Sequence, residues 1–193
     1  MSTDEQQDRG QILLSIARAS IAEALGRHYV LPDYDQPWLD EPGASFVTLT
    51  RNGALRGCIG SLEAHRPLRV DVASNALAAA LRDPRFPPLT SREWPDIRVE
   101  VSLLSPPEPL PVASEQDAWE KLRPHVDGVI LEYGPYRSTF LPQVWEQLPD
   151  PDRFLAHLKM KAGLPWDFWA PQLKLARYSV RKWKEPEQEI VTP

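Results

Sequence analysis

The dipeptide Asn52-Gly53 constrains the fold of this chain more than any other pair of residues. It lies between two apolar segments with strand character, SFVTLT at 45–50 and LRGCIGSL at 55–62. Asn-Gly favours the positive φ angles of a type I′ turn, which joins two antiparallel strands directly. A doubly wound parallel sheet, in which every connection is a crossover, is therefore excluded for this region.

Further strand and helix signals follow along the chain. GVILEY and YRSTFL flank Gly134-Pro135 and are predicted to form a second hairpin. Residues 97–104 alternate between apolar and polar side chains, which predicts a strand with one buried face. KLARYSVRKW is predicted as the last strand. Apolar periodicity and capping residues predict four helices, at 8–25, 67–82, 114–122 and 151–163.

Together these elements predict an α+β fold, with a mainly antiparallel or mixed sheet and flanking helices. The first hairpin is expected to pair with the strand at 97–104. The apolar face of that strand should lie under the helix at 67–82 or the helix at 8–25. Small side chains on the 67–82 helix should allow close packing against the sheet; they belong to the stripe Ala73, Ala76, Leu77 and Ala80.

The composition restricts the classes of function. The 193 residues carry a net charge of −5, which argues against a general polyanion-binding protein. The single cysteine, Cys58, excludes an internal disulfide and a cysteine-based zinc site. The four histidines lack metal-ligand spacing, so neither a metal nor another cofactor is expected. With a polar, acidic N-terminus and no apolar run near the roughly 20 residues of a membrane helix, a cytoplasmic protein without membrane contact is expected.

The segment LRGCIG contains the first candidate site. Regular alternation would place Arg56, Cys58 and Gly60 on one face of a strand. An arginine two residues from a cysteine could lower the pKa of the thiol and make it nucleophilic. Alternatively, Cys58 is a small buried apolar residue. Gly57 and Gly60 favour close approach, by a ligand or by another part of the protein.

The segment DPRFPPL contains the second candidate site. Its prolines fix the direction of Asp83 and Arg85, and the guanidinium of Arg85 could grip a carboxylate or phosphate through two hydrogen bonds. The structural alternative is that Asp83 caps backbone amides and Arg85 pairs with an acid. Asn75, on the preceding helix, is a candidate for hydrogen bonding to the backbone.

Arginines are concentrated between residues 51 and 92. This window holds seven arginines, no lysine and three acidic residues, although the whole chain is acidic. An arginine-rich patch suits an anionic ligand or an acidic protein surface. It is equally typical of a solvated face with nothing bound.

Beyond these local signals, the chain resembles the AMMECR1 domain family. The matching segments run in family order over nearly the whole chain. They are FVTLTRNGALRGCIGSLEAHRPL, NALAAALRDPRFPPLTSREW, VEVSLLSPPEPL, DGVILEYGPYRSTFLPQVWEQ and FLAHLKMKAGLPWDFW. LRGCIG and DPRFPPL together make this resemblance highly specific.

The resemblance implies a compact α+β domain over residues 8–183, made of two subdomains with the LRGCIG strand beside a cleft between them. Residues 1–7 and 184–193 are expected to be flexible termini. Bacterial and archaeal members resemble one component of a three-part set, whose other members are a Memo-like protein and a radical SAM enzyme. Family members often carry a cysteine just before KAGL. This chain has Lys159 and Met160 there, which argues against a two-cysteine mechanism.

The resemblance also implies a set of site residues. Cys58 and Glu100 are the candidates for catalysis. The candidates for ligand binding are Arg56, Gly57, Gly60, Asn75, Asp83, Arg85, Thr139 and Gln143, and Phe86 and Lys161 also match motif positions.

Three functions stay open at this point. The first is a binding component that holds a small anionic metabolite or a partner protein in the cleft. The second is an enzyme whose active site contains Cys58, Arg56, Arg85 and Glu100. The third, nucleic-acid binding through the arginines, is disfavoured by the net negative charge and the lack of an RNA-binding motif.

Overall fold

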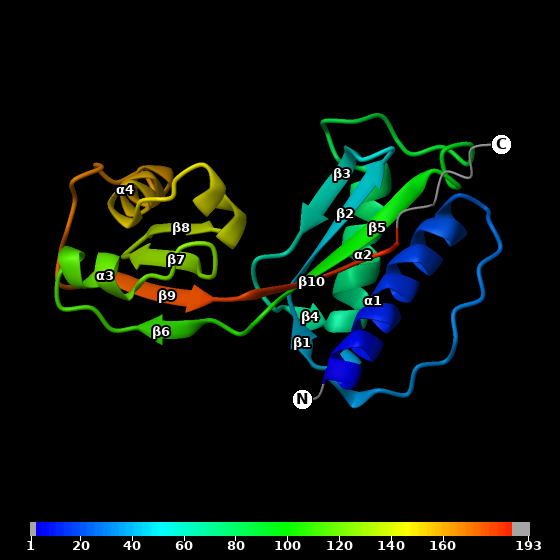
Figure 1. Ribbon diagram of the computed structural model, residues 1–193, viewed down its shortest axis with the longest axis horizontal. Helices are drawn as coiled ribbons and strands as arrows, with labels where there is room; N and C mark the ends of the chain where they lie inside the picture. Colours follow the sequence, from blue (N-terminus) through cyan, green and yellow to red (C-terminus); the bar gives the residue numbers. More distant parts are fainter. Residues whose placement is uncertain (1–2, 187–193) are drawn as a thin grey trace. The chain divides into compact units, whose positions relative to one another are not determined.

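The structure, a computed structural model, describes residues 3–186. These residues form two compact units, each built on its own four-stranded sheet. Unit 1 contains the chain up to Leu104 and the segment from Arg181 onward, and unit 2 contains Ser105–Val180. Figure 1 shows the elements of both units. Helices and largely antiparallel strands alternate, so the fold is α+β as the sequence predicts.

The sheet of unit 1 is built around the predicted hairpin. Its strands are arranged in the order β10-β5-β2-β3. Asn52 and Gly53 have φ angles of 51° and 78°, which confirms the predicted turn. β2 also pairs antiparallel with β5, with Val47 opposite Val101. The bounds are Ser45–Arg51 for β2, Ala54–Gly60 for β3, Ile97–Leu104 for β5 and Val180–Lys184 for β10.

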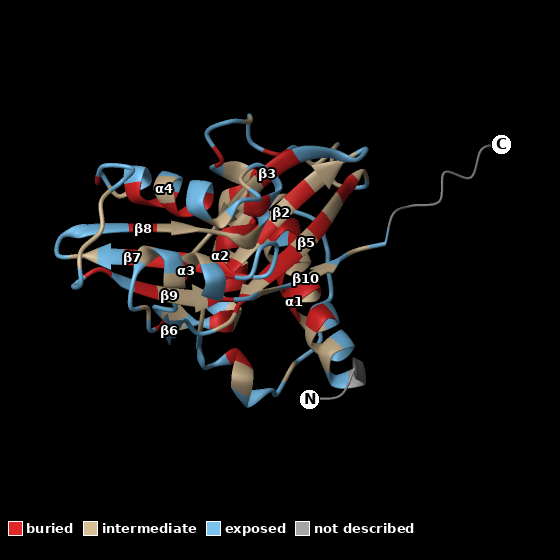
Figure 2. Ribbon diagram, turned by 60° about the vertical axis from the view of Figure 1, so that its left-hand side comes forward, coloured by how far each residue is buried: buried red, intermediate tan, exposed pale blue. Residues whose placement is uncertain are grey.

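Two helices, α1 (Thr3–Ala24) and α2 (Leu68–Leu81), pack against each other and against this sheet. Apolar side chains of α1, α2, β2 and β5 form one continuous core, and Figure 2 shows buried residues on these four elements. The predicted stripe of α2 is partly wrong, because Ala73 and Leu77 are only half-buried. The buried apolar residues of α2 are Leu68, Val72, Ala76, Ala79 and Ala80.

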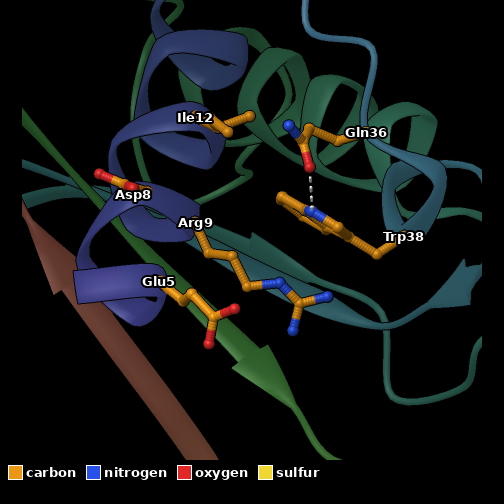
Figure 3. Close-up of a pocket in the computed structure, with 6 residues that line it drawn as sticks. All are labelled: Glu5, Asp8, Arg9, Ile12, Gln36 and Trp38. Atoms are coloured by element: carbon orange, nitrogen blue, oxygen red, sulfur yellow. Dashed lines mark hydrogen bonds between the residues drawn. The ribbon is translucent and has the colours of Figure 1, made fainter. Parts of the chain in front are cut away.

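Smaller elements complete unit 1. β1 (Pro42–Gly43) pairs with β4 (Arg66–Pro67), directly before α2. The short helix η1 (Pro37–Leu39) lies in the proline-rich loop that follows α1. Its Trp38 contacts α1, where the Arg9 guanidinium lies 4.2 Å from the centre of the indole (Figure 3).

The edge strand β3 contains a bulge that the sequence did not reveal. Leu55 pairs with Thr50 and Gly57 pairs with Leu49, so the two residues Arg56 and Gly57 occupy the space of one. The extra residue reverses the alternation, and Arg56 and Gly57 both face the helices. The prediction that Arg56 and Cys58 share a face is therefore wrong.

Unit 2 has a sheet in the order β6-β9-β7-β8, with the predicted second hairpin formed by β7 and β8. Its core combines apolar side chains of the strands, of two helices and of a short helical segment, η2, and in it Trp145 stacks on Phe154 at 3.7 Å between ring centres. The bounds are β6 Glu108–Leu110, α3 Glu115–Lys121, β7 Gly128–Tyr133, β8 Tyr136–Phe140, η2 Pro142–Glu146, α4 Pro151–Lys161 and β9 Lys174–Tyr178.

The prediction of one last strand in KLARYSVRKW is wrong, because the segment forms two strands in two different sheets. β9 pairs with β7 and β6, whereas β10 lies beside β5. The break is at Ser179, whose N–H donates to the Ser105 hydroxyl at 3.0 Å and whose carbonyl accepts from the Ser105 N–H at 2.9 Å. The two segments that connect the units are thus held side by side.

The helical and strand bounds near the termini differ from the expected ones. α1 begins at Thr3, five residues before the predicted start. Glu185, which the sequence places in the flexible C-terminal tail, makes a bidentate ion pair with Arg18 and accepts from the Val99 N–H. The rest of the expected flexible tail, from residue 187, lies outside the described residues.

Candidate functional site

Cys58 lies on the face of the unit 1 sheet that is turned away from the two helices. Thr48 is opposite Cys58 on β2, and Glu100 is opposite Thr48 on β5, so the three form a row across three strands. Cys58 is half-buried. The Thr48 hydroxyl donates to its sulfur at 3.3 Å.

Asp83 and Arg85 close the free edge of β3 at Cys58. The Cys58 N–H donates to Asp83 Oδ2 at 2.8 Å, and Arg85 Nη2 donates to the Cys58 carbonyl at 3.1 Å. Asp83 also accepts from the backbone N–H, Nε and Nη2 of Arg85. The pair therefore takes the place of a neighbouring strand at one residue of β3. This outcome supports the structural interpretation of DPRFPPL, in which Asp83 caps amides and Arg85 pairs with an acid.

The charges at this edge are strongly coupled. The Asp83 carboxylate is only 1% exposed, and Arg85 together with the Cys58 N–H holds the pKa of Asp83 well below its ordinary value, although burial opposes the shift. Asp83 in turn raises the pKa of Arg85, and the sulfur of Cys58 adds to the effect. The arginine whose charge reaches the thiol is thus Arg85.

Arg56 is buried in a different ion pair. Its Nε donates to Glu93 Oε1 at 2.8 Å, and this contact is the main reason why the pKa of Glu93 falls to about 2. Hydrogen bonds from Thr90 lower the pKa of Glu93 further. The guanidinium carbons of Arg56 and Arg85 lie 5.9 Å and 5.6 Å from the centre of the Phe86 ring. Both arginines therefore lie near the Phe86 ring, and each is paired with its own carboxylate, Glu93 for Arg56 and Asp83 for Arg85.

Both glycines of the motif are explained by packing. A Cβ at Gly57 would lie 2.1 Å from the Ala79 carbonyl oxygen of α2, and one at Gly60 would lie 2.2 Å from the Phe46 ring. The backbone of α2 and an aromatic side chain thus occupy the space that the sequence left open for a ligand.

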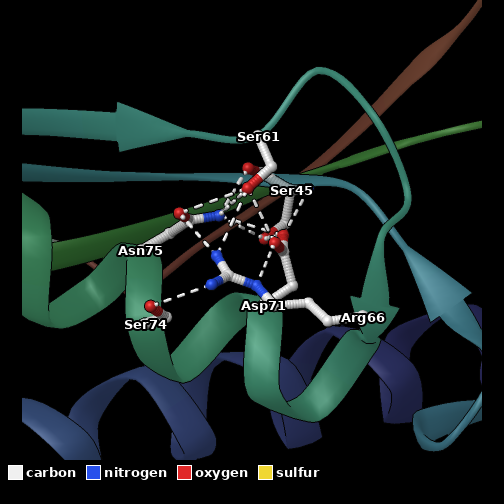
Figure 4. A network of polar contacts seen from close by, with 6 residues as sticks. All are labelled: Ser45, Ser61, Arg66, Asp71, Ser74 and Asn75. Atoms are coloured by element: carbon white, nitrogen blue, oxygen red, sulfur yellow. Dashed lines mark hydrogen bonds and ion pairs between the residues drawn. The ribbon is translucent and has the colours of Figure 1, made fainter.

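Asn75 belongs to a buried polar network that ties α2 to the sheet (Figure 4). Its amide donates to the Ser45 carbonyl at 2.9 Å, which confirms the prediction of backbone bonding. The centre of the network is Asp71, 1% exposed, which accepts from Asn75 and from Arg66. Asp71 also accepts from the Ser45 N–H and from the hydroxyls of Ser45 and Ser61. Because its donors all come from the protein, this carboxylate has a structural role.

Glu100 lies two strands away from Cys58 in this row. Neighbouring strands are about 4.8 Å apart, so the backbones of the two residues are separated by about 10 Å. Thr48, which lies between them, is the residue that contacts the thiol.

Thr139 and Gln143 belong to unit 2 and are not part of the row around Cys58. The Thr139 hydroxyl bonds to the Tyr178 hydroxyl at 3.1 Å, and the Thr139 carbonyl accepts from Lys161 Nζ at 2.9 Å. Gln143 is exposed at the start of η2. Tyr178, whose pKa is raised by burial, also donates to the Phe140 carbonyl.

Most arginines of the patch are already paired with acids. The pairs are Arg51 with Glu93 and Asp96, Arg56 with Glu93, Arg66 with Asp71, Arg69 with Asp40, and Arg85 with Asp83. Three of these acids lie outside the 51–92 window, which is why the count of charges overstated the positive potential. This pairing argues against the patch as a nucleic-acid-binding surface.

Sequence reasoning missed three residues that shape this region: Thr48, Asp71 and Glu93. Thr48 could have been found from the hairpin register, which places it opposite Cys58. Asp71 and Glu93 gave no local signal, because their partners are distant in sequence. Within residues 3–186, no group of three or more histidine, cysteine, aspartate or glutamate side chains is arranged to hold a metal. The same residues include no helix with the length and apolarity needed to span a membrane.

Comparison with known proteins agrees with this fold and these motifs. The AMMECR1 family model matches residues 14–183. A protein of Methanothermobacter thermautotrophicus is 42% identical over 183 residues, which cover 93% of this chain and 95% of that protein. Protein MJ0810 of Methanocaldococcus jannaschii is 40% identical over 191 residues, covering 95% and 94%. The chain therefore belongs to the AMMECR1 family.

A solved structure supports the same assignment. The crystal structure of the uncharacterized protein PH0010 from Pyrococcus horikoshii matches with a TM-score of 0.76 and 36% identity, and covers 92% of each chain. The family and the α+β fold are thus shown by sequence and by structure.

Proposed function

We propose that this AMMECR1-family protein is the binding component of a cytoplasmic three-part system with a Memo-like protein and a radical SAM enzyme. It binds a small anionic ligand, or an acidic group of a partner protein, at Arg85 beside Cys58. The residues of the proposed site are Cys58, Asp83, Arg85 and Thr48. Co-elution of the three purified proteins would support the assembly, and separate elution of this chain would contradict it.

One observation carries the binding proposal: the Arg85 guanidinium is fixed and yet 53% exposed. Two carboxylate oxygens of Asp83 and the Cys58 carbonyl hold its Nε and Nη2, so its plane is set before a ligand arrives. Arginine in a fixed orientation is suited to carboxylate and phosphate groups.

The test is a thermal-unfolding series with phosphate and di- and tricarboxylates. A ligand that binds only the folded state raises the melting temperature with concentration, and about 100 times the dissociation constant stabilises by about 2.7 kcal/mol. Arg85→Ala should abolish the rise, measured against its own unliganded melting temperature. Arg69→Ala is the matched control, because it removes another part-exposed arginine of unit 1 that is paired with an aspartate. The Arg69→Ala variant should keep the rise in melting temperature. An equal rise in both variants would contradict binding at Arg85.

A second candidate function is thiol chemistry at Cys58. It is favoured by the two polar groups beside the sulfur, the Thr48 hydroxyl and the Arg85 guanidinium, because reactive cysteines lie in electropositive, partly exposed surroundings. Since the chain has a single cysteine, the rate of alkylation reports on this residue alone.

Iodoacetamide at pH 7 distinguishes this candidate from a structural thiol. If Cys58 is nucleophilic, it should react faster than free cysteine, and Arg85→Ala and Thr48→Val should slow it several-fold. Arg56→Ala, which removes an arginine from the opposite face of β3, should not change the rate. A wild-type thiol that reacts no faster than free cysteine would exclude the enzyme candidate at this residue.

A further inference from the structure

Unit 2 contains a pocket that none of the motifs above includes. It has a volume of about 280 Å³ and lies among α3, the first turns of α4 and the loop after α4. This volume is slightly below the roughly 300–1,000 Å³ of pockets for drug-sized ligands, so the pocket suits a small chemical group. Its lining consists of Glu115, Trp119, Asp152, Arg153, Ala156, Trp166 and Asp167.

Two tryptophans supply the aromatic surface of this pocket. Trp166 is 65% exposed, which is unusual for so large an apolar side chain. The Trp119 indole nitrogen is buried and has no hydrogen-bond partner among the described residues. Within the described residues, Trp166 is thus left largely uncovered, and the Trp119 N–H lacks an acceptor.

Two other tryptophans of the chain have a cation over the ring. Arg9 lies over Trp38 at 4.2 Å, as Figure 3 shows, and Arg18 lies over Trp94 at 4.7 Å. Within the described residues, no lysine or arginine lies over Trp119 or Trp166. Arg153 lines the same pocket without stacking on either ring. The pocket thus contains two indoles over which no cation of the described residues lies.

The charges of the lining favour a cation. Three carboxylates and one guanidinium line the pocket. Glu115 is paired with Lys159, which is completely buried beneath it, at 2.5 Å. Asp152 and Asp167 are exposed, and both supply negative charge beside the indoles. Indole faces and carboxylates together form the usual recognition surface for alkylated ammonium groups.

We propose that this pocket of unit 2 binds an alkylammonium group, through the faces of Trp119 and Trp166 and the carboxylates of Asp152 and Asp167. The group is carried either by a small quaternary amine or by a methylated lysine of a partner protein. The chemistry is the same for both sources, and the site is independent of the one at Arg85.

The test is a ligand-observed NMR titration of the full chain with choline and with 3,3-dimethylbutan-1-ol. The two probes have the same shape, and only choline carries a charge. Cation–π contributions predict that choline binds between about 2-fold and about 30-fold more tightly than the alcohol. A second pair of probes, a peptide with trimethyllysine and the same peptide with alanine at that position, tests the protein source. If the trimethyllysine peptide binds more tightly than choline, the natural source of the group is a partner protein. If choline binds more tightly, the source is a small molecule.

Two pocket variants and two controls complete the test. Trp166→Leu keeps an apolar side chain but removes the indole, and should reduce the preference for choline to near unity. Asp167→Asn should weaken choline binding and its dependence on salt. Trp38→Leu and Asp150→Asn, which change a tryptophan and an aspartate outside the pocket, should leave binding unchanged. Glu115 is unsuitable for substitution, because the buried Lys159 would lose its partner.

The proposal is overturned if neither cationic probe binds more tightly than its uncharged analogue. It is also overturned if Trp166→Leu and Trp38→Leu reduce choline binding equally.

Discussion

β3 is an edge strand of the sheet in unit 1, and β8 is an edge strand of the sheet in unit 2. In both units, a side chain that is distant in sequence forms a hydrogen bond with the backbone of this edge strand. At β3 a buried carboxylate and a fixed guanidinium engage the N–H and carbonyl of Cys58. At β8 the exposed Lys161 donates to the Thr139 carbonyl at 2.9 Å, and its ammonium lies 5.1 Å from the centre of the Phe140 ring. The backbone of each edge strand is thus engaged at one residue, by a buried carboxylate and a guanidinium in unit 1 and by a single exposed lysine in unit 2.

The difference teaches how a structural device can also prepare a binding site. Because Asp83 takes two donors of Arg85, the guanidinium beside Cys58 stays in one orientation. Lys161 of unit 2 is held by a backbone carbonyl and an aromatic ring, and not by a carboxylate. In unit 1, edge protection and the candidate site therefore depend on the same residues, and in unit 2 they do not.

The largest expected effect concerns the packing of the two sheets. Gly57→Ala places a Cβ 2.1 Å from a backbone oxygen of α2, and we expect a loss of about 3 kcal/mol in the free energy of unfolding. Gly128→Ala in β7 places a Cβ against the Tyr178 side chain rather than against backbone, and should lose less, about 1–2 kcal/mol. Urea unfolding of both variants gives the comparison. Equal losses would mean that unit 1 is not the more tightly packed of the two.

Next in size is the loss of the edge contacts themselves. Asp83→Ala leaves the Cys58 N–H and Arg85 without their acceptor, and should destabilise the protein by about 2–3 kcal/mol. Lys161→Ala removes one bond from an exposed lysine, and should lose about 0.5–1 kcal/mol. The two free energies of unfolding are measured under the same conditions. Similar values would show that the buried pair at β3 is no stronger than the lysine at β8.

The smallest effect is on acid stability. In the folded protein the pKa of Asp83 is lowered, and the pKa of Glu93 is lowered to about 2. A lowered folded pKa contributes stability at pH values above the ordinary pKa, and the contribution disappears as pH falls through the folded value. We therefore expect the free energy of unfolding to fall between about pH 5 and pH 2. Asp83→Asn and Glu93→Gln should flatten this decline.

Glu132→Gln, an exposed carboxylate of unit 2, is the control for the pH series and should leave the slope unchanged. If it flattens the decline as much as Asp83→Asn does, acid sensitivity is not concentrated in unit 1.

The elements that depend on neighbours in sequence were predictable. Asn52-Gly53 predicts the turn between β2 and β3, and the alternation in 97–104 predicts β5, because both signals are local. The bulge at Arg56 could not be predicted, since it arises from the fit of β3 against α2. The break at Ser179 could not be predicted either. Each half of KLARYSVRKW has strand character, and only tertiary contacts assign the two halves to different sheets.

The candidate site was predictable in its position but not in its chemistry. LRGCIG and DPRFPPL were both identified, yet their contact joins residues 25 positions apart, and no sequence pattern specifies it. Regular alternation would place Arg56 beside the thiol, but the bulge turns Arg56 to the other face of β3. The arginine that contacts Cys58 is Arg85. The arginine patch was overestimated because Asp40, Glu93 and Asp96 lie outside the window that was counted.

The mutual hydrogen bonds of Ser105 and Ser179 have a consequence for how this chain can be divided. They bring together the two ends of residues 105–180, so that unit 2 is a continuous insertion between β5 and β10 of unit 1. A segment whose ends meet can be excised, or replaced by a short link, without stretching the chain that receives it. This chain can thus be regarded as a host domain, unit 1, that carries unit 2 as a guest.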